Sequence, residues 1–380
     1  MHMRYPFLDL ATINARYADD LHRAAARVID SGRYIGGSET EEFNRMLAGL
    51  CRAPHAIGVS NGLDALRLII EGYKVTGRLS PGDEIIIPAN TYIASVLAVT
   101  HAGLNPVLVD PDETSMNLSA TGVLEAITEK TRAIMPVHLY GQVAWSEELA
   151  DLARNHGLIV IEDAAQAIGA TSPTDGLFGS RKAGALGHAG AFSFYPTKNI
   201  GALGDAGAVV THDTELFKAV AALANYGGDR RYHNIYAGFN CRMDPIQAAM
   251  LCAKLPDADA SSARRFERAV AYNNVISHPG VIKPAISPTV TDQIWHQYVI
   301  RVPAARDRFI EYLTSEGVGT DIHYATSPHM QPCYRTLPHR PLPVTERLAS
   351  EIVSLPISDC TSVADAADIG RIINKFPIHR

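Results

Sequence analysis

Over residues 55–212, short apolar segments alternate with longer amphipathic segments. Short apolar runs bounded by turn residues predict buried strands, and amphipathic segments predict helices. The predicted strands are residues 55–60, 84–88, 106–110, 133–138, 158–163, 191–194 and 208–212. The predicted helices are residues 63–73, 93–101, 120–129 and 147–156. Because the strands are apolar along most of their length and separated by helices, we predict an α/β fold with a mostly parallel sheet covered on both faces.

The region before the first predicted strand has a helical pattern. Ser38 and Glu41 have the spacing of a capping box, in which each side chain bonds the other residue's backbone N–H. They follow the turn Gly36-Gly37, which suits the start of a helix. We therefore predict a helix that begins at Ser38 and ends near Cys51.

The pattern changes again near Asp244, which precedes a proline at a suitable first helical position. A long helical segment follows to about His278, and then a strand over residues 295–302 and a helix over residues 304–317 are predicted. This second part reads as a smaller α+β domain. The predicted domains are residues 1–244, a large α/β domain, and residues 245–380, a small C-terminal α+β domain.

Composition disfavours several classes of protein. The net charge of −6 gives no support to a nucleic acid or an anionic membrane as partner. The five cysteines are scattered and form no C-x-x-C pair, which argues against a disulfide framework or a zinc site and fits a reducing compartment. No apolar segment approaches the ~20 residues needed to span a bilayer, and no signal-peptide pattern is present. We therefore expect a cytoplasmic protein without a metal centre.

A single lysine, Lys198, lies between an aromatic-rich apolar segment, residues 192–195, and a glycine-rich run. A desolvated lysine has a lowered pKa and can form a Schiff base with an aldehyde. Upstream, Asp163 ends a predicted strand at the edge where open α/β sheets bind ligands. Pyridoxal 5'-phosphate (PLP) needs such a lysine and an acidic partner for its ring nitrogen. The two residues together predict a PLP site, although Asp163 alone could equally cap the following turn.

Four further residues are candidate cofactor contacts. Gly62 joins a predicted strand to a helix, so backbone N–H groups there could bind a phosphate. Ser193 would face the same cleft if its aromatic neighbours pack into the core. Gln166 could contact the phenolic oxygen of the cofactor, and Tyr92 could stack on its ring. The alternatives are an ordinary turn glycine, a strand serine without function, a surface glutamine and a core tyrosine.

Other polar residues have less defined roles. His323 and Tyr324 follow a predicted strand of the small domain and are candidates for the substrate pocket. His138 is interpreted as a core or supporting histidine, and Glu162 as structural because it should point away from Asp163. The candidates for diphosphate contacts, which could equally be solvated surface charges, are Arg230, Arg231 and Lys182.

With these residues in place, the chain resembles the fold-type-I, PLP-dependent sugar aminotransferases of the DegT/DnrJ/EryC1/StrS family from about Pro6 to about Phe376. The segments 163–166 and 193–199 carry the resemblance. It implies a Schiff base at Lys198 and a pairing of Asp163 with the pyridine nitrogen. The other contacts that the resemblance implies are Gln166 to the ring oxygen, Tyr92 on the ring, Gly62, Leu63 and Ser193 at the phosphate, and Asn240 at the phosphate site of a neighbouring subunit.

Because Asn240 would serve a neighbouring subunit, the resemblance also implies a homodimer with shared active sites. One departure concerns the phosphate turn, where much of the family has Ser-Gly-Thr and this chain has Asn61-Gly62-Leu63. A hydroxyl contact to the phosphate is lost there, so backbone groups must do more. Some relatives carry histidine in place of the lysine and dehydrate sugars; Lys198 favours transamination.

Residues 61–67 and 90–95 are most similar to enzymes that aminate C3 of dTDP-3-oxo-6-deoxyhexoses for surface polysaccharides or antibiotics. This resemblance implies glutamate as the amino donor and a nucleotide-diphosphate keto sugar as the acceptor. The alternatives are a C4 aminotransferase acting on a 4-keto-6-deoxyhexose and a non-catalytic PLP-binding regulator. A nucleotide-binding α/β protein without covalent chemistry is a third, but no G-x-G-x-x-G or P-loop lysine follows the first strand. Sugar configuration and nucleotide identity stay open.

Overall fold

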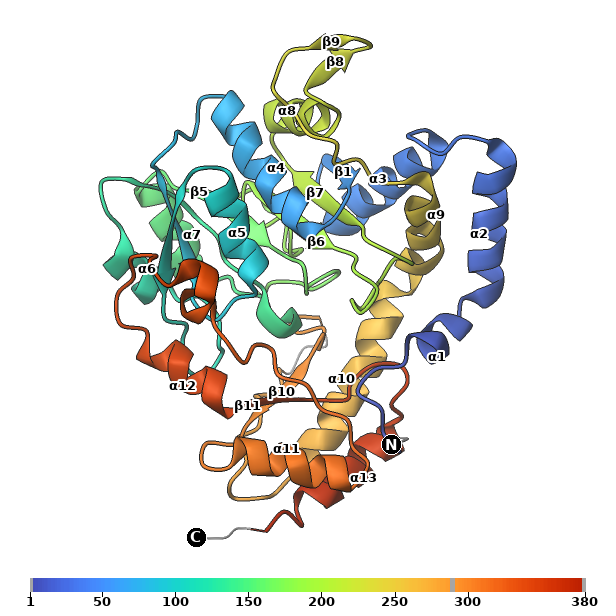
Figure 1. The fold of residues 1–380 in the computed structure, drawn as a ribbon, viewed down its shortest axis with the longest axis vertical. Helices are drawn as coiled ribbons and strands as arrows, with labels where there is room; N and C mark the ends of the chain where they lie inside the picture. Colours follow the sequence, from blue (N-terminus) through green and yellow to red (C-terminus); the bar gives the residue numbers. More distant parts are fainter. Residues whose placement is uncertain (1–2, 288–290, 378–380) are drawn as a thin grey trace.

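A seven-stranded sheet lies at the centre of the fold, in a computed structural model that describes residues 3–287 and 291–377 (Figure 1). The strand order is β1-β7-β6-β5-β4-β2-β3; β7 is antiparallel to both β1 and β6, and the other neighbouring pairs are parallel. The prediction of a mostly parallel sheet is therefore confirmed. The strands are β1 (His55–Val59), β2 (Glu84–Pro88), β3 (Asn105–Val109), β4 (Thr131–Ile134), β5 (Ile159–Asp163), β6 (Ala189–Ser193) and β7 (Gly207–Thr211).

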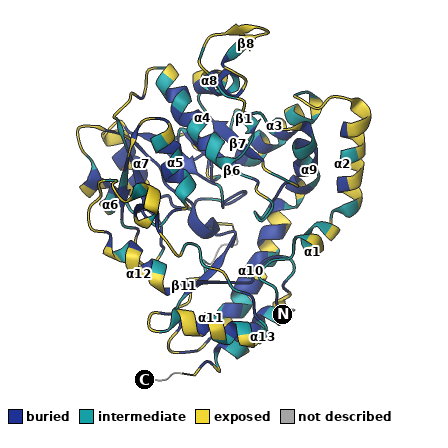
Figure 2. Ribbon diagram, in the orientation of Figure 1, coloured by how far each residue is buried: buried dark blue, intermediate teal, exposed yellow. Residues whose placement is uncertain are grey.

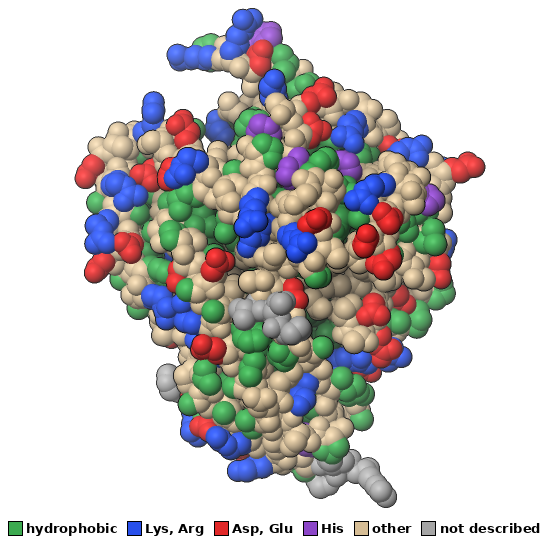
Figure 3. Space-filling model, turned by 180° about the vertical axis from the view of Figure 1, so that it is seen from behind, with side chains coloured by type: hydrophobic (Ala, Val, Ile, Leu, Met, Phe, Trp, Pro, Cys, Tyr) green, Lys and Arg blue, Asp and Glu red, His purple; other side chains and the backbone are tan. Residues whose placement is uncertain are grey.

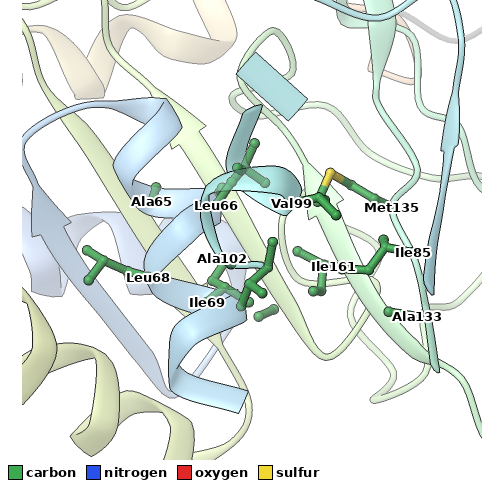
Figure 4. Close-up of a cluster of buried hydrophobic side chains, with 14 of the residues drawn as sticks. Ala65, Leu66, Leu68, Ile69, Ile85, Val99, Ala102, Ala133, Met135 and Ile161 are labelled. Atoms are coloured by element: carbon green, nitrogen blue, oxygen red, sulfur yellow. The ribbon is translucent and has the colours of Figure 1, made fainter. Parts of the chain in front are cut away.

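Helices cover both faces of the sheet because successive strand residues point to opposite sides. On β2, Ile85 and Ile87 pack into one core cluster while Ile86 packs into another. Figure 4 shows the first cluster, in which Leu66, Ile69 and Val99 meet the strands. Helices α4 (Gly62–Val75), α5 (Ile93–His101) and α8 (Thr214–Ala224) cover this face. The opposite face is covered by α3 (Ser38–Cys51), α6 (Ala120–Ala126), α7 (Glu147–Asn155) and α9 (Pro245–Lys254).

Two predictions about local structure were wrong. The helix predicted from Ser38 has the predicted length, but its N-cap is Gly37 and no capping box forms. Gly37 has φ of 95°, a conformation that glycine adopts without strain, so Ser38 is already the first helical residue. The strand predicted over residues 133–138 ends at Ile134, because Pro136 has no N–H for the ladder.

The C-terminal part has a separate core (Figure 2). The predicted long helix is interrupted at Pro256, and the strand predicted over residues 295–302 is reduced to β10. Tyr272, Trp295 and Tyr298 stack in this core. The elements are η2 (Leu255–Asp257), α10 (Ala258–Val275), β10 (Tyr298–Arg301), α11 (Arg306–Ser315), α12 (Pro343–Glu351), β11 (Ile352–Leu355) and α13 (Val363–Ile373).

The domain boundary at Asp244 stays a prediction. Helix α9 follows this boundary, yet its Ala248 and Leu251 pack into the cluster that covers the sheet. At the N-terminus, α1 (Leu10–Ala15) and α2 (Ala18–Ser31) lie outside α9 (Figure 1). Among the helices of the described residues, none is long and apolar enough to cross a membrane.

Candidate active site

Asp163 and Lys198 come together because they lie at or just beyond the ends of neighbouring parallel strands. Asp163 is the last residue of β5 and lies opposite Ala191 of β6, and the chain reaches Lys198 shortly after β6 ends. The Asp163 carboxylate is buried. Its Oδ2 accepts a hydrogen bond from Ser95 Oγ at 2.7 Å, and its Oδ1 accepts one from the Ala165 N–H at 3.1 Å. Asp163 therefore does cap the following turn, but its other oxygen is fixed within the cleft.

The Lys198 side chain is desolvated. Burial lowers the pKa of its amine from 10.5 to about 8, and the nearby Asp163 carboxylate opposes only part of this effect. The amine forms no hydrogen bond or ion pair with any other residue that the structure describes. A larger share of Lys198 is therefore neutral near pH 8 than for a solvated lysine, and a neutral amine is the nucleophilic form.

The Gly62 turn and Ser193 are in direct contact. A Cβ on Gly62 would lie 2.7 Å from the Ser193 Cβ, so only glycine permits this approach. Gly62 is the first residue of α4, and the Asn61 side chain caps the helix by accepting a hydrogen bond from the Asp64 N–H at 2.8 Å. The free N–H groups of this first turn and the Ser193 hydroxyl thus border one space, and a helix N-terminus favours an anion.

Aromatic and amide side chains lie together near Asp163, whose charge acts on Tyr324. The Tyr92 ring is 53% exposed, and its centroid lies 5.0 Å from that of Tyr324. Gln166 donates from Nε2 to the Tyr324 hydroxyl at 3.0 Å and accepts at Oε1 from the Tyr140 N–H at 2.6 Å. Tyr324 thus lies between Gln166 and Tyr92, so the structure brings this substrate-pocket candidate into the same cleft.

Comparison with known proteins decides the family. Residues 16–374 match the DegT/DnrJ/EryC1/StrS aminotransferase family. The chain belongs to this family. It is an aminotransferase, and it uses PLP, the cofactor of the family.

Two curated relatives and one solved structure cover almost the whole of this aminotransferase. It is 43% identical over 374 residues to dTDP-3-amino-3,6-dideoxy-alpha-D-galactopyranose transaminase of Aneurinibacillus thermoaerophilus, covering 98% of this chain and 99% of the relative. It is 42% identical to dTDP-3-amino-3,4,6-trideoxy-alpha-D-glucose transaminase of Streptomyces venezuelae, covering 93% and 91%. The crystal structure of S. venezuelae DesV with a ketimine intermediate matches with a TM-score of 0.92 at 40% identity, covering 98% of each chain.

The residues of the cleft fit PLP. Lys198 offers a desolvated amine without a partner in the described chain, and Asp163 offers a carboxylate held by Ser95. Gly62 lies close to Ser193. Leu63 has no hydroxyl, so the backbone N–H groups of this turn are the donors that remain for a phosphate. The roles of these residues toward PLP stay predictions, as does the contact of Gln166 with the ring oxygen.

Sequence reasoning missed two hydroxyls behind Asp163. Thr91 Oγ1 and Ser95 Oγ lie 2.7 Å apart, and both side chains are buried. They continue the hydrogen-bond chain that ends at Asp163 Oδ2. Thr91 precedes the N-cap of α5 and Ser95 lies in its first turn, and this closeness in the sequence is the available signal.

One acidic and one basic residue near the cleft, Glu162 and His138, have structural roles. Glu162 is fully buried and bonds His138 Nε2 at 2.8 Å. It also accepts hydrogen bonds from the backbone N–H groups of Gly184, Leu186 and Gly187. These contacts fix the loop before β6, as expected from a side chain that points away from Asp163.

The three basic candidates for diphosphate contacts do not gather in the cleft. Lys182 donates to the Gly169 carbonyl at 3.1 Å and packs within its own loop. Arg230 and Arg231 are exposed on the hairpin of β8 (Gly228–Arg230) and β9 (His233–Asn234), which protrudes from the top of the molecule (Figure 1). Figure 3 shows basic side chains projecting from this protrusion. Asn240 is exposed and bridges Asn225 at the base of the hairpin.

Proposed function

We propose that this aminotransferase transfers the amino group of glutamate to C3 of a dTDP-linked 3-oxo-6-deoxyhexose. The observation that carries the proposal is the similarity over nearly full length to two curated transaminases of dTDP-3-amino sugars. These relatives share the nucleotide and the aminated carbon but differ in the sugar. The proposal therefore specifies dTDP and C3, and does not specify the substituent at C4.

PLP, when bound, supplies an electron sink that lets an amino group pass between two substrates. Lys198 acts as the base and acid of both half-reactions. Its neutral amine removes the proton from the α-carbon of glutamate, and in the second half-reaction it moves a proton at C3 of the sugar. A pKa of about 8 suits this role, because both protonation states are accessible near neutral pH.

The remaining residues position the reacting groups. The Asp163 carboxylate holds a proton on the ring nitrogen, and Ser95 fixes the orientation of that carboxylate. The first turn of α4 and Ser193 anchor the phosphate, while the exposed ring of Tyr92 covers one face of the cofactor. These assignments follow the geometry of the cleft and the resemblance of the motifs.

The active unit that we propose is a homodimer. Asn240 lies at the base of an exposed hairpin whose aromatic residues have little contact with their own subunit, Tyr226 being 52% and Tyr232 89% exposed. Exposed aromatic residues on a protruding element are typical of an interface. We propose that Asn240 and Arg230 complete the phosphate and substrate sites of the neighbouring subunit.

The decisive experiment is incubation of the holoenzyme with glutamate and dTDP-linked 3-keto and 4-keto-6-deoxyhexoses. The product is isolated and the carbon that bears the new amine is located by NMR. We expect amination at C3 and formation of 2-oxoglutarate in equal amount. Amination at C4 would refute the proposed regiochemistry, and spectral changes with glutamate but no amino sugar would favour a PLP-binding regulator.

A further inference from the structure

A small cavity of about 140 Å³ lies beside the loop that carries Lys198. Its walls come from segments far apart in the sequence: the N-terminus, the lysine loop, α10, and the chain around β10 and β11. The wall residues used below are Thr197, Arg265, His296, Asp321, His323 and Ser358. Thr197 precedes Lys198, and the charge of Lys198 acts on His296 and His323 of the wall, so the cavity lies near the reacting amine.

The guanidinium of Arg265 is buried in the wall of this cavity and forms no ion pair with a carboxylate of the described residues, although the charge of nearby Asp359 acts on it. Arg265 is only 5% exposed. Its Nη1 donates to the carbonyls of Trp295 at 3.1 Å and His296 at 3.3 Å, whereas its buried Nε bonds no other described residue. Carbonyl oxygens carry only partial charge, so they do not neutralise a guanidinium. A buried cation without a direct ion pair is costly, and an anionic ligand in contact with it would lower that cost.

The nearby carboxylates are committed to other arginines. Asp257 pairs with Arg264 at 2.6 Å, and Asp359 pairs with both Arg264 at 2.8 Å and Arg268 at 3.0 Å. The cluster therefore holds one more guanidinium than carboxylates in the described chain. Burial lowers the pKa of Arg265 to about 10, so the side chain is still charged at neutral pH.

The other ionisable groups on the wall do not cancel this charge. Burial lowers the pKa of both His296 and His323, and the charge of Lys198 acts in the same direction, although Asp321 opposes the shift of His323. The cationic form of both rings is therefore disfavoured, and neither ring can supply a negative charge. The acid on the wall, Asp321, has a side chain that is 58% exposed at the rim, 3.7 Å from His323 Nε2. The interior of the cavity thus has a positive potential next to Lys198.

We propose that this cavity binds a carboxylate group of the amino donor, with Arg265 as its counter-ion. The inference rests on the proposed function and adds a subsite that anchors the amino donor. A carboxylate matches the planar guanidinium, which can offer it two N–H donors at once.

The test is the binding of glutarate, a dicarboxylate without an amine, to the holoenzyme by isothermal titration calorimetry. Arg265→Lys keeps a positive charge but loses the planar pair of donors. We expect the Kd of glutarate to rise about tenfold or more, because a charge-assisted contact contributes roughly 1.5–3 kcal/mol. The matched control is Arg264→Lys on the same helix, whose contacts face Asp257 and Asp359 rather than the cavity; its Kd should be unchanged.

A second variant tests the proposal even if Arg265→Lys does not fold. Ser358→Val adds carbon atoms to the wall of the cavity and keeps Arg265, so it should also weaken glutarate binding. Circular dichroism establishes that each variant is folded. Unchanged glutarate binding in folded Arg265→Lys and Ser358→Val would overturn the proposal. A weaker affinity for dTDP with unchanged affinity for glutarate would also overturn it, since the cavity would then serve the diphosphate.

The two proposals fail in different ways. If the holoenzyme aminates no dTDP keto sugar, the proposed function fails while the glutarate titration still decides what the cavity binds. If amination proceeds and the glutamate KM of folded Arg265→Lys equals that of the wild type, the donor subsite fails and the proposed function stands. Support for the subsite is a raised KM for glutamate with an unchanged KM for the keto sugar.

Discussion

The cleft at the ends of β5 and β6 and the hairpin of β8 and β9 differ in how their polar side chains are held. In the cleft, Asp163 and Gln166 are buried and each bonds other residues of the same chain. On the hairpin, Arg230 and Tyr232 are exposed. A site within one subunit is preorganised by its own fold, whereas a site at an interface is completed by assembly. The predictions below test this difference, beginning with the largest effect.

Replacing Lys198 should have the largest effect in the cleft. We expect Lys198→Ala to lower kcat by about 10⁴-fold or more, because one amine serves as Schiff-base partner, base and acid. Borohydride reduction followed by mass spectrometry should place the trapped adduct on Lys198 in the wild type. The control is Lys218→Ala, an exposed lysine on α8 that should keep full activity. Wild-type turnover in Lys198→Ala would refute the assignment.

Asp163→Asn should have the second largest effect on activity. The amide keeps the shape of the carboxylate. Its oxygen can accept from the Ala165 N–H while its NH2 group donates to Ser95 Oγ, because a hydroxyl can also accept, so the fold should change little. It removes the negative charge that holds a proton on the ring nitrogen, and we expect kcat to fall by about 10²–10³-fold. Steady-state kinetics and urea unfolding, measured together, separate the two effects. Unchanged kinetics would mean that Asp163 only caps the turn after β5.

The sequence predicts those features of this cleft that are set by residues close together in the chain, and not those that depend on the packing of distant segments. The bounds of β2 and α5 agree with prediction, since both are set by local apolar patterns and turn residues. Asp163 and Lys198 were recognised because each follows a strand, and parallel strands end at one edge of a sheet. Their meeting with Ser95 and the position of Arg265 depend on how α5 and α10 pack, which no local pattern specifies. Gly37 was missed as an N-cap because its φ is set by the preceding turn.

Removing the hydroxyl of Ser95 should have a smaller effect than changing Asp163 itself. Ser95→Ala leaves the carboxylate in place but deletes a donor to its Oδ2 and leaves the Thr91 hydroxyl without this partner. We expect kcat to fall by about tenfold. The matched control is Ser180→Ala, a buried serine that donates to the Cys51 carbonyl far from the cleft. If both variants lose activity equally, Ser95 has only a structural role.

Whether Asn240 serves the neighbouring subunit can be tested by mixing two inactive variants. Lys198→Ala lacks the amine but keeps Asn240, and Asn240→Ala has the reverse defect. If Asn240 serves the neighbouring subunit, a mixed dimer contains one intact site, so an equal mixture should recover roughly a quarter of wild-type activity. The mixture is refolded together and compared with each variant alone. Activity no higher than the average of the separate variants would place Asn240 in its own subunit's site or outside any site.

The smallest expected effect concerns the stability of the cofactor-free protein at high pH. The pKa of Lys198 is about 8 in the folded chain against an ordinary value of 10.5, so the unfolded chain binds more protons between these values. The contribution of Lys198 to stability therefore rises as the pH increases from 8 to 10.5. Lys198→Met should show a smaller rise in urea midpoint over this range than the wild type. Lys218→Met should match the wild type, because that lysine is exposed in the folded chain as well. An equal rise in all three proteins would show that the Lys198 amine is solvated, and the cleft would then resemble the hairpin more than a preorganised site.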